Sequence, residues 1–105
     1  MNKDEVRIRI LSTGLCASDY LYGRGHWGQK QYPIITGHEI VGEIDTLGED
    51  VNNFKKGDIV MLGPLRDFCG NCEHCNINKT NVCQEIEHGD KKLYGKYWGG
   101  YSTHL

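Results

Sequence analysis

The stretch CGNCEHCNINKTNVC, residues 69–83, carries four of the chain's five cysteines and decides how this part of the molecule folds. Its spacing is C-x2-C-x2-C-x7-C, and a structural Zn²⁺ site takes four thiolates in a tetrahedron at about 2.3 Å each. Two intervening residues let a tight turn present two sulfurs to one ion, and glycine and asparagine, which follow the first cysteine here, favour turns. We therefore predict a structural zinc ion held by Cys69, Cys72, Cys75 and Cys83.

Three other interpretations of these cysteines remain open on spacing alone. The odd total of five cysteines, and a charged start (MNKDEVRIRI) unlike a signal peptide, fit a disulfide framework poorly. An iron–sulfur run would share C-x2-C-x2-C, but its fourth cysteine follows after three residues and precedes proline, whereas Gln84 follows Cys83. A redox C-x-x-C pair has no βαβ pattern around it. We expect His74, inside the cluster, to be a solvated bystander, because four thiolates already fill the tetrahedron.

The sequence around the cysteines predicts short strands. Apolar and charged residues alternate strictly in EVRIRIL (5–11), as in a half-buried strand. HEIVGEIDTLG (38–48) and DIVMLGP (58–64) predict two more strands, and Gly42 inside the first of these indicates a bulge or a close backbone approach. YWGGYSTHL (97–105) is expected to begin a final strand. The chain is therefore predicted to be mainly β, a β-barrel with short helices.

The connections between these strands carry the remaining structural expectations. Ser18 or Asp19 is expected to cap a short helix that runs into YLYG. Glycines and a proline make GRGHWGQKQYP a loop. Residues 66–88 are expected to form a lobe ordered by zinc rather than by a core, within a single domain over 1–105. Tyr97 and Trp98 are expected to pack in the core or against the lobe.

Composition limits the classes of function. A net charge of −2 gives no electrostatic reason to expect nucleic acid or an anionic membrane as partner. The longest apolar run, IVMLGPL, is too short to span a bilayer. Together with the start that is unlike a signal peptide, this leads us to expect a cytoplasmic protein. In such a reducing compartment, clustered cysteines bind metal more often than they form disulfides.

The fifth cysteine, Cys16, belongs to a second group of residues able to bind metal. It precedes His38 by 22 residues in the sequence, and Glu39 follows directly. A thiolate with an imidazole suits zinc, and a catalytic zinc site needs only three protein ligands. From the residues alone this signal is weak, because a single cysteine and a histidine are more often a buried thiol and a hydrogen-bonded histidine than a metal site.

A family resemblance supports metal binding by both groups of residues. GHEIVGEIDTLGEDV (37–51) matches the signature G-H-E-x2-G-x5-[GA]-x2-[IVSAC] of zinc-containing medium-chain alcohol dehydrogenases, and FKKGDIVMLGP followed by the four-cysteine loop continues the pattern in order. Nearly the whole chain resembles the GroES-like catalytic domain of that family. GHWG, YP, GHEIVG and GGYS are most similar to the cinnamyl alcohol dehydrogenase branch.

The resemblance implies a structural zinc at the four clustered cysteines and a catalytic zinc at Cys16 and His38, with Glu39 as a ligand or an exchangeable near-ligand. It also implies that Asp19 orients the His38 imidazole and that Ser18 passes a proton from the bound alcohol. The activity implied is interconversion of small alcohols and aldehydes by zinc Lewis-acid catalysis, with hydride transfer to or from NAD or NADP. We expect the full-length protein to be homo-oligomeric.

The sequence departs from the family pattern at three positions. Ala17 replaces the histidine or arginine that often follows the ligand cysteine, and Leu21 replaces the histidine that often completes the proton relay. Thr36 replaces the proline common before GHE. The candidates to replace this histidine in the relay are Tyr20, Tyr22, His26 and water. By resemblance Trp27 and Tyr32 line a substrate pocket, although loop packing explains them equally well.

GRGHWG (23–28) has the spacing G-x-G-x-x-G, but it lies in a predicted loop rather than between a strand and a helix, and no βαβ unit occurs in these 105 residues, so no dinucleotide-binding domain is predicted within them. The sequence is therefore expected to be a fragment that is inactive in isolation. The alternative function, from a different class, is a zinc-stabilised structural or binding module whose catalytic site is vestigial.

Overall fold

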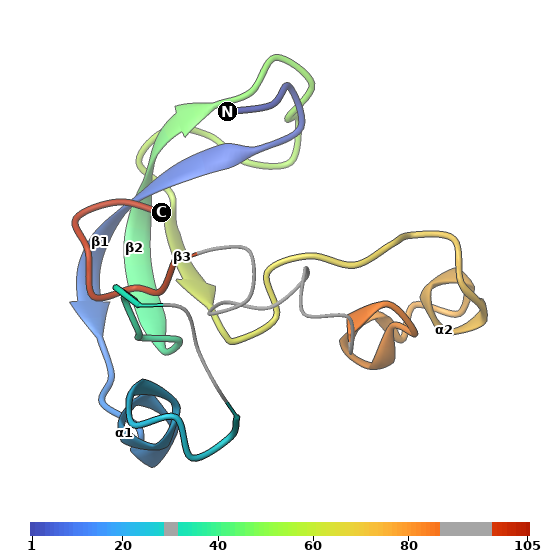
Figure 1. Ribbon diagram of the computed structural model, residues 1–105. Coiled ribbons are helices and arrows are strands. Elements are labelled where there is room, and N and C mark those ends of the chain that lie inside the picture. The colour runs from blue at the N-terminus through green and yellow to red at the C-terminus, as the bar shows by residue number, and fades with distance from the viewer. Residues whose placement is uncertain (29–31, 87–97) are drawn as a thin grey trace.

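The computed structural model describes residues 1–28, 32–86 and 98–105. Three strands, β1 (Val6–Thr13), β2 (Ile40–Leu47) and β3 (Ile59–Leu62), form one antiparallel sheet in the order β1-β2-β3. Helix α1 (Ala17–Gly23) follows β1, and the short helices α2 (Glu73–Asn76) and η1 (Thr80–Val82) follow β3. Figure 1 shows α1 beyond one end of the sheet and α2 set out to its side. The predicted mainly β fold with short helices is confirmed.

Alternation along β1 and β2 gives the sheet one apolar and one charged face. Ile8 and Ile44 are buried on the apolar face, and Ile44 has no exposed surface. On the other face Arg7 Nε donates to Asp45 Oδ2 at 2.7 Å, and the carboxylate of Glu43 pairs with the next arginine of β1. The Arg7 hydrogen bond lowers the pKa of Asp45. Exposed pairs of this kind contribute little to stability, so the apolar face holds the sheet together.

Gly42 allows β1 and β2 to approach closely, as its position in a strand predicted. A Cβ at this position would meet the side chain of Ile8 and would lie 2.7 Å from the carbonyl oxygen of Arg9. The register between the two strands shifts on either side of this region, between Arg7 and Ile8 and again after Ile10. Such irregularities bend a strand and increase its twist.

The C-terminal segment differs from the strand expected there. Only the last three residues run beside β1, where Ile8 and Leu105 exchange both backbone hydrogen bonds, at 2.8 and 2.9 Å. The sole β-bridge in this segment joins His104 to Arg9. Trp98 is 52% exposed and so is not part of the core; its packing against the lobe, the other alternative, stays a prediction, and Tyr97 lies outside the described residues. The backbone of 99–101 instead bonds to residues 35–37, which brings this segment to the metal centre described below.

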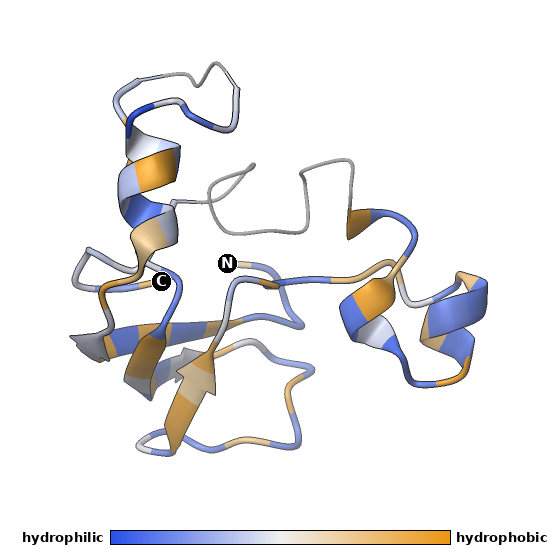
Figure 2. Cartoon of the chain, turned by 90° about the horizontal axis from the view of Figure 1, so that it is seen from below, coloured by the Kyte–Doolittle hydropathy of each residue, from blue (hydrophilic) through white to orange (hydrophobic). Residues whose placement is uncertain are grey.

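Strand β3 presents apolar side chains on the outside of the sheet. Ile59 and Met61 are 63% and 83% exposed, and β3 is coloured as hydrophobic along its length in Figure 2. In the part of the chain that the structure describes, no helix combines the length and the apolar character needed to cross a bilayer.

A lobe formed by residues 69–86 has its own small core. Cys75, Cys83 and Ile86 are buried there, and Leu65 packs against them. In both ribbon views the lobe stands apart from the sheet (Figures 1 and 2). So few apolar side chains cannot order a segment of this length by burial alone. That zinc orders the lobe stays a prediction, and residues 87–88 of the predicted range lie outside the described residues.

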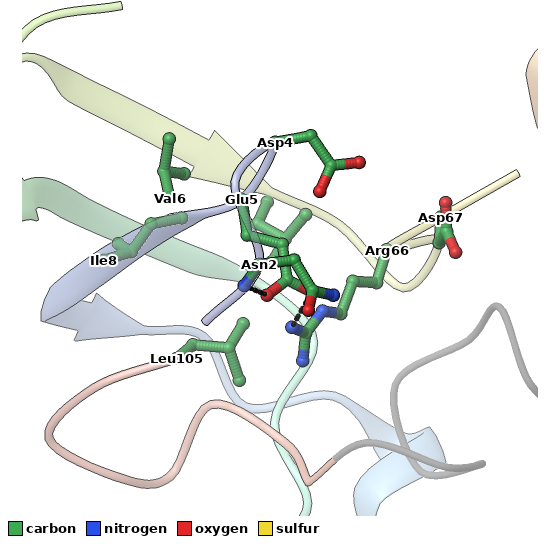
Figure 3. Close-up of a pocket in the computed structure, with 9 residues that line it drawn as sticks. Asn2, Asp4, Glu5, Val6, Ile8, Arg66, Asp67 and Leu105 are labelled. Atoms are coloured by element: carbon green, nitrogen blue, oxygen red, sulfur yellow. Dashed lines mark hydrogen bonds and ion pairs between the residues drawn. The ribbon is translucent and has the colours of Figure 1, made fainter. Parts of the chain in front are cut away.

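A cavity of about 280 Å³ lies where the N-terminal turn meets the connection to the lobe (Figure 3). Arg66 Nη2 reaches to 3.9 Å from Glu5 Oε1 across it, and Asp4 and Leu105 also line it. Neither cysteine group contributes to its wall, so this cavity is not part of the candidate metal centres.

Candidate metal centres

The four clustered cysteines converge on one point in the lobe. Their sulfurs all lie within 4.8 Å of one another, and Cys69 Sγ is 3.9 Å from Cys75 Sγ. Tetrahedral thiolates at about 2.3 Å from an ion are about 3.8 Å apart, whereas a disulfide needs about 2.05 Å. All five cysteines, each within the described residues, are free. The donor set and its spacing therefore fit zinc.

Backbone N–H groups of the lobe point at the sulfurs. The N–H of Cys72 donates to Cys69 Sγ at 3.3 Å, and that of Cys75 donates to Cys72 Sγ at 3.5 Å, which caps α2. The N–H groups of Gln84 and Cys75 lower the pKa of Cys72 to about 6. Burial raises the pKa of Cys75 to about 12, and the N–H of Cys69 lowers the pKa of Cys83. The N–H groups of the loop favour the thiolate at Cys72 and Cys83, whereas the Cys75 thiol, whose pKa burial raises, is left to be deprotonated by a cation.

His74 is less solvated than its position predicted. Its Nδ1 is buried and has no hydrogen-bond partner among the described residues. It nevertheless lies outside both groups of converging ligands. The prediction that it is not a ligand agrees with the geometry, whereas the prediction that it is solvated is wrong at this atom.

Zinc binding to the four-cysteine cluster is expected to release protons and to weaken as the pH falls. At pH 7.5 the metal-free cluster keeps the Cys75 proton, while Cys72 is already a thiolate. Binding expels the remaining protons, so the apparent affinity should fall from pH 8 to pH 7, and more steeply below about pH 6, where Cys72 also becomes protonated. Chelator competition across this pH range measures the effect. An affinity that does not change with pH would contradict it.

The second group is assembled where the end of β1 meets the start of β2. Gly14 N donates to the Glu39 carbonyl oxygen at 2.7 Å, which places the start of α1 beside His38. Ligand atoms of Cys16, His38 and Glu39 lie within 4.8 Å of one another. His38 is buried, Cys16 is half-buried and Glu39 is exposed. The arrangement offers a soft sulfur, an imidazole and a carboxylate on the open side, which fits a zinc site accessible to a small molecule.

The Asp19 side chain contacts the backbone and the imidazole of this group on the side away from solvent. Its carboxylate is buried and accepts hydrogen bonds from Cys16 N at 3.0 Å and Gly37 N at 2.8 Å. Its Oδ1 is 3.5 Å from His38 Nδ1, which leaves Nε2 as the imidazole atom available to a metal. The expectation about capping needs correction, because the N-cap of α1 is Cys16. Asp19 lies one turn into the helix and reaches back to the backbone of the cap.

Ser18 lies next to the Cys16 sulfur. The Cys16 thiol donates to Ser18 Oγ at 3.4 Å, so the hydroxyl faces the candidate ligands. Tyr20 and His26 stack on each other, with ring centroids 6.2 Å apart. Trp27 is exposed, and Tyr32 is also exposed but donates to the Gly23 carbonyl oxygen at 2.5 Å. The cavity of Figure 3 contains neither of these two aromatic residues, and their role in a pocket stays a prediction.

Gly37, directly before His38, has a backbone that an L side chain rarely adopts, with φ of 103°. A Cβ there would lie 2.8 Å from Tyr101 N. Gly37 thus lets the 99–101 segment pack on the chain that carries His38. Through this contact the site gains Tyr101, whose hydroxyl lies 3.2 Å from Asp19 Oδ2. Sequence reasoning missed Tyr101, and GGYS within the resemblance was the one signal that pointed to its segment.

Negative charge surrounds the Tyr101 hydroxyl. Its partial burial, together with the charges of Asp19 and Glu39, raises the pKa of Tyr101. The phenol therefore remains a proton donor through the neutral range. Two acceptors share this donor, since the Gly14 carbonyl oxygen lies 3.0 Å away.

Comparison with known proteins places this geometry in one family. The family model for the alcohol dehydrogenase GroES-like domain matches residues 2–105. Probable cinnamyl alcohol dehydrogenase 6 of Arabidopsis thaliana is 35% identical over 109 residues, covering 98% of this chain and 29% of that protein.

Solved structures agree with the sequence comparison. CAD from Helicobacter pylori, complexed with NADP(H), superposes with a TM-score of 0.84 at 31% identity, over 99% of this chain and 31% of its own. A cinnamyl alcohol dehydrogenase from Sorghum bicolor gives 0.85 at 32% identity, with the same coverage of 99% and 31%. The chain thus spans less than a third of each of these relatives. The family match over residues 2–105, the relatives and the superposed structures together show that the chain belongs to the alcohol dehydrogenase GroES-like domain family.

Proposed function

We propose that this chain is the zinc-binding catalytic domain of an NAD(P)-dependent alcohol dehydrogenase that interconverts small alcohols and aldehydes. The convergence of Cys16, His38 and Glu39 in front of the buried Asp19 carboxylate is the observation that carries the proposal. Relatives that share the fold include cinnamyl alcohol dehydrogenases, and the Helicobacter pylori structure holds NADP(H), which favours NADP over NAD.

The residues of the site have separate roles in this proposal. Cys16, His38 and Glu39 would hold a catalytic zinc, and Asp19 would keep the imidazole in the orientation that directs Nε2 outward. Zinc bound there would supply Lewis-acid stabilisation of an alkoxide or polarisation of a carbonyl. Ser18, beside the ligand sulfur, would accept the proton of the alcohol and pass it toward solvent. A dehydrogenase also needs a nicotinamide, and no residue of this chain is assigned to bind it.

The cysteine lobe has a structural role in the same proposal. Cys69, Cys72, Cys75 and Cys83 would hold the second zinc, and the lobe predicted over 66–88 would be part of a single catalytic domain that extends over 1–105. A cytoplasmic location and homo-oligomeric assembly of the whole enzyme belong to the proposal too. We further propose that the 105-residue chain by itself has no turnover.

Two equivalents of zinc are expected in the purified chain, and the second should depend on Glu39. Glu39→Gln removes a charged ligand and should lower affinity for the second equivalent about 10-fold or more, whereas Glu43→Gln, an exposed carboxylate on β2, should not. Saturating zinc should also protect Cys16 from alkylation. Metal analysis and mass spectrometry of alkylated peptides measure both effects, and the same preparation should give no NAD(P)H-dependent reduction of an aromatic aldehyde.

One zinc equivalent, with Cys16 alkylated equally fast with and without the ion, would support the module with a vestigial site instead. Turnover by the isolated chain would contradict only its proposed inactivity.

A further inference from the structure

We propose that Tyr101 is a positioning residue for the metal group formed by Cys16, His38 and Glu39, and that it acts through Asp19 without touching the ion. This inference rests on the proposed function, because it assigns a role relative to the zinc of that site. The sequence places Tyr101 82 positions after Asp19, and the structure brings its hydroxyl to 3.2 Å from Asp19 Oδ2.

The two oxygens of the Asp19 carboxylate have different surroundings. Oδ1 accepts from Gly37 N and faces His38 Nδ1. Oδ2 accepts from Cys16 N at the start of α1 and lies within reach of the Tyr101 hydroxyl. Donors on both oxygens fix the plane of the carboxylate, and that plane sets the direction from which Oδ1 faces the imidazole. Removing the hydroxyl leaves Oδ2 with one fewer donor and lets the carboxylate rotate.

The backbone of Tyr101 is attached to the same segment that carries His38. Tyr101 N donates to the Thr36 carbonyl oxygen at 2.9 Å, and Gly100 N donates to the Gly37 carbonyl oxygen at 2.7 Å. The backbones that carry the Tyr101 phenol and the His38 imidazole are therefore hydrogen-bonded to each other. The Asp19 carboxylate, on α1, lies between the two side chains. A closed set of contacts of this kind gives a distant residue control over the orientation of a ligand.

A second tyrosine provides a matched control. Tyr32 also donates its hydroxyl to a backbone carbonyl, that of Gly23, and is similarly exposed, at 52% against 42% for Tyr101. This hydrogen bond involves no carboxylate and no residue of the metal group. Tyr32→Phe and Tyr101→Phe thus remove the same atom from comparable bonds, one outside the metal group and one behind it.

The test uses the 105-residue chain with zinc in the four-cysteine cluster, titrated with Co²⁺ as the probe of the second group. Thiolate ligation of Co²⁺ gives a visible spectrum that reports the geometry of the ligands. Tyr101→Phe is expected to weaken Co²⁺ binding about 3- to 10-fold and to alter that spectrum. Tyr32→Phe should stay within about 2-fold of the wild-type chain, with an unchanged spectrum. Circular dichroism of each variant verifies that the chain is folded.

Equal Co²⁺ affinity and equal spectra for the two variants would overturn the inference while leaving the proposed function standing. A folded Tyr101→Phe chain with a changed spectrum supports it, because a merely structural role of the hydroxyl would not alter the ligand field. If the wild-type chain takes up no second metal ion, the proposed function fails, and the inference fails with it. That outcome is recognisable because the wild-type chain and both variants then behave alike.

Discussion

Cys75→Ser is expected to unfold the lobe of residues 69–86 while the sheet stays folded. Cys75 is buried in the lobe, where the core formed by the described residues consists mainly of the cysteines, Ile86 and Leu65. Structural zinc in small domains contributes about 10–16 kcal/mol at pH 7. Loss of a residue that only hydrogen-bonds a ligand lowers metal affinity by up to about 100-fold, so loss of the ligand Cys75 itself should lower zinc affinity by more. Hydrogen exchange should then show the lobe unprotected and β2 still protected.

Cys16→Ser is the matched control, because it removes a cysteine sulfur outside the lobe. Its lobe should keep the protection of the wild-type chain. Chelation of zinc should reproduce the Cys75→Ser pattern without any substitution. Protection of the lobe in the Cys75→Ser chain, or simultaneous loss of protection in β2, would contradict the prediction that the ion orders the lobe alone.

Asp19→Ala is expected to lower the free energy of unfolding by about 2–5 kcal/mol. Its carboxylate is buried and satisfies the backbone N–H groups of Cys16 and Gly37. Each buried donor left without a partner costs about 1–3 kcal/mol, and removing one side of a buried polar pair adds to this. Urea denaturation followed by circular dichroism, with zinc saturating, measures the loss.

Asp45→Ala tests whether the effect belongs to the buried site. Asp45 pairs with Arg7 on the exposed face of the sheet, so its removal should destabilise the chain much less than Asp19→Ala does. Asp19→Asn, which keeps the shape of the side chain and one carbonyl oxygen, should be milder than Asp19→Ala. If Asp19→Ala were no more destabilising than Asp45→Ala, the central role given to this carboxylate would be wrong.

Local features were the part of the fold that the sequence predicted well. Alternation fixed the position of β1 and β2 because burial of one face imposes a period of two. The four-cysteine spacing predicted its own convergence, since Cys69 and Cys83 are joined by one short loop. Gly42 signalled a close approach because a glycine inside a strand has few other reasons to be there.

Features that depend on distant contacts were predicted poorly or only through the family resemblance. Cys16 and His38 meet because the strands on either side pair, which spacing alone does not reveal. The helix cap was assigned to Ser18 or Asp19 on propensity, yet Asp19 turns back to serve the cap and His38 together. The final segment has the composition of a strand, but the backbone of residues 99–101 bonds to residues 35–37 instead of continuing a strand. This pairing places Tyr101 behind the metal group.

The contact at Gly37 limits how this domain can be redesigned. Two stretches of main chain touch there with no room for an added carbon. Most variants in a library randomised at Gly37 are therefore expected to misfold. Variation near the group of Cys16, His38 and Glu39 is better placed at an exposed position such as Ala17, directly after the cysteine, where a bulkier group displaces only solvent.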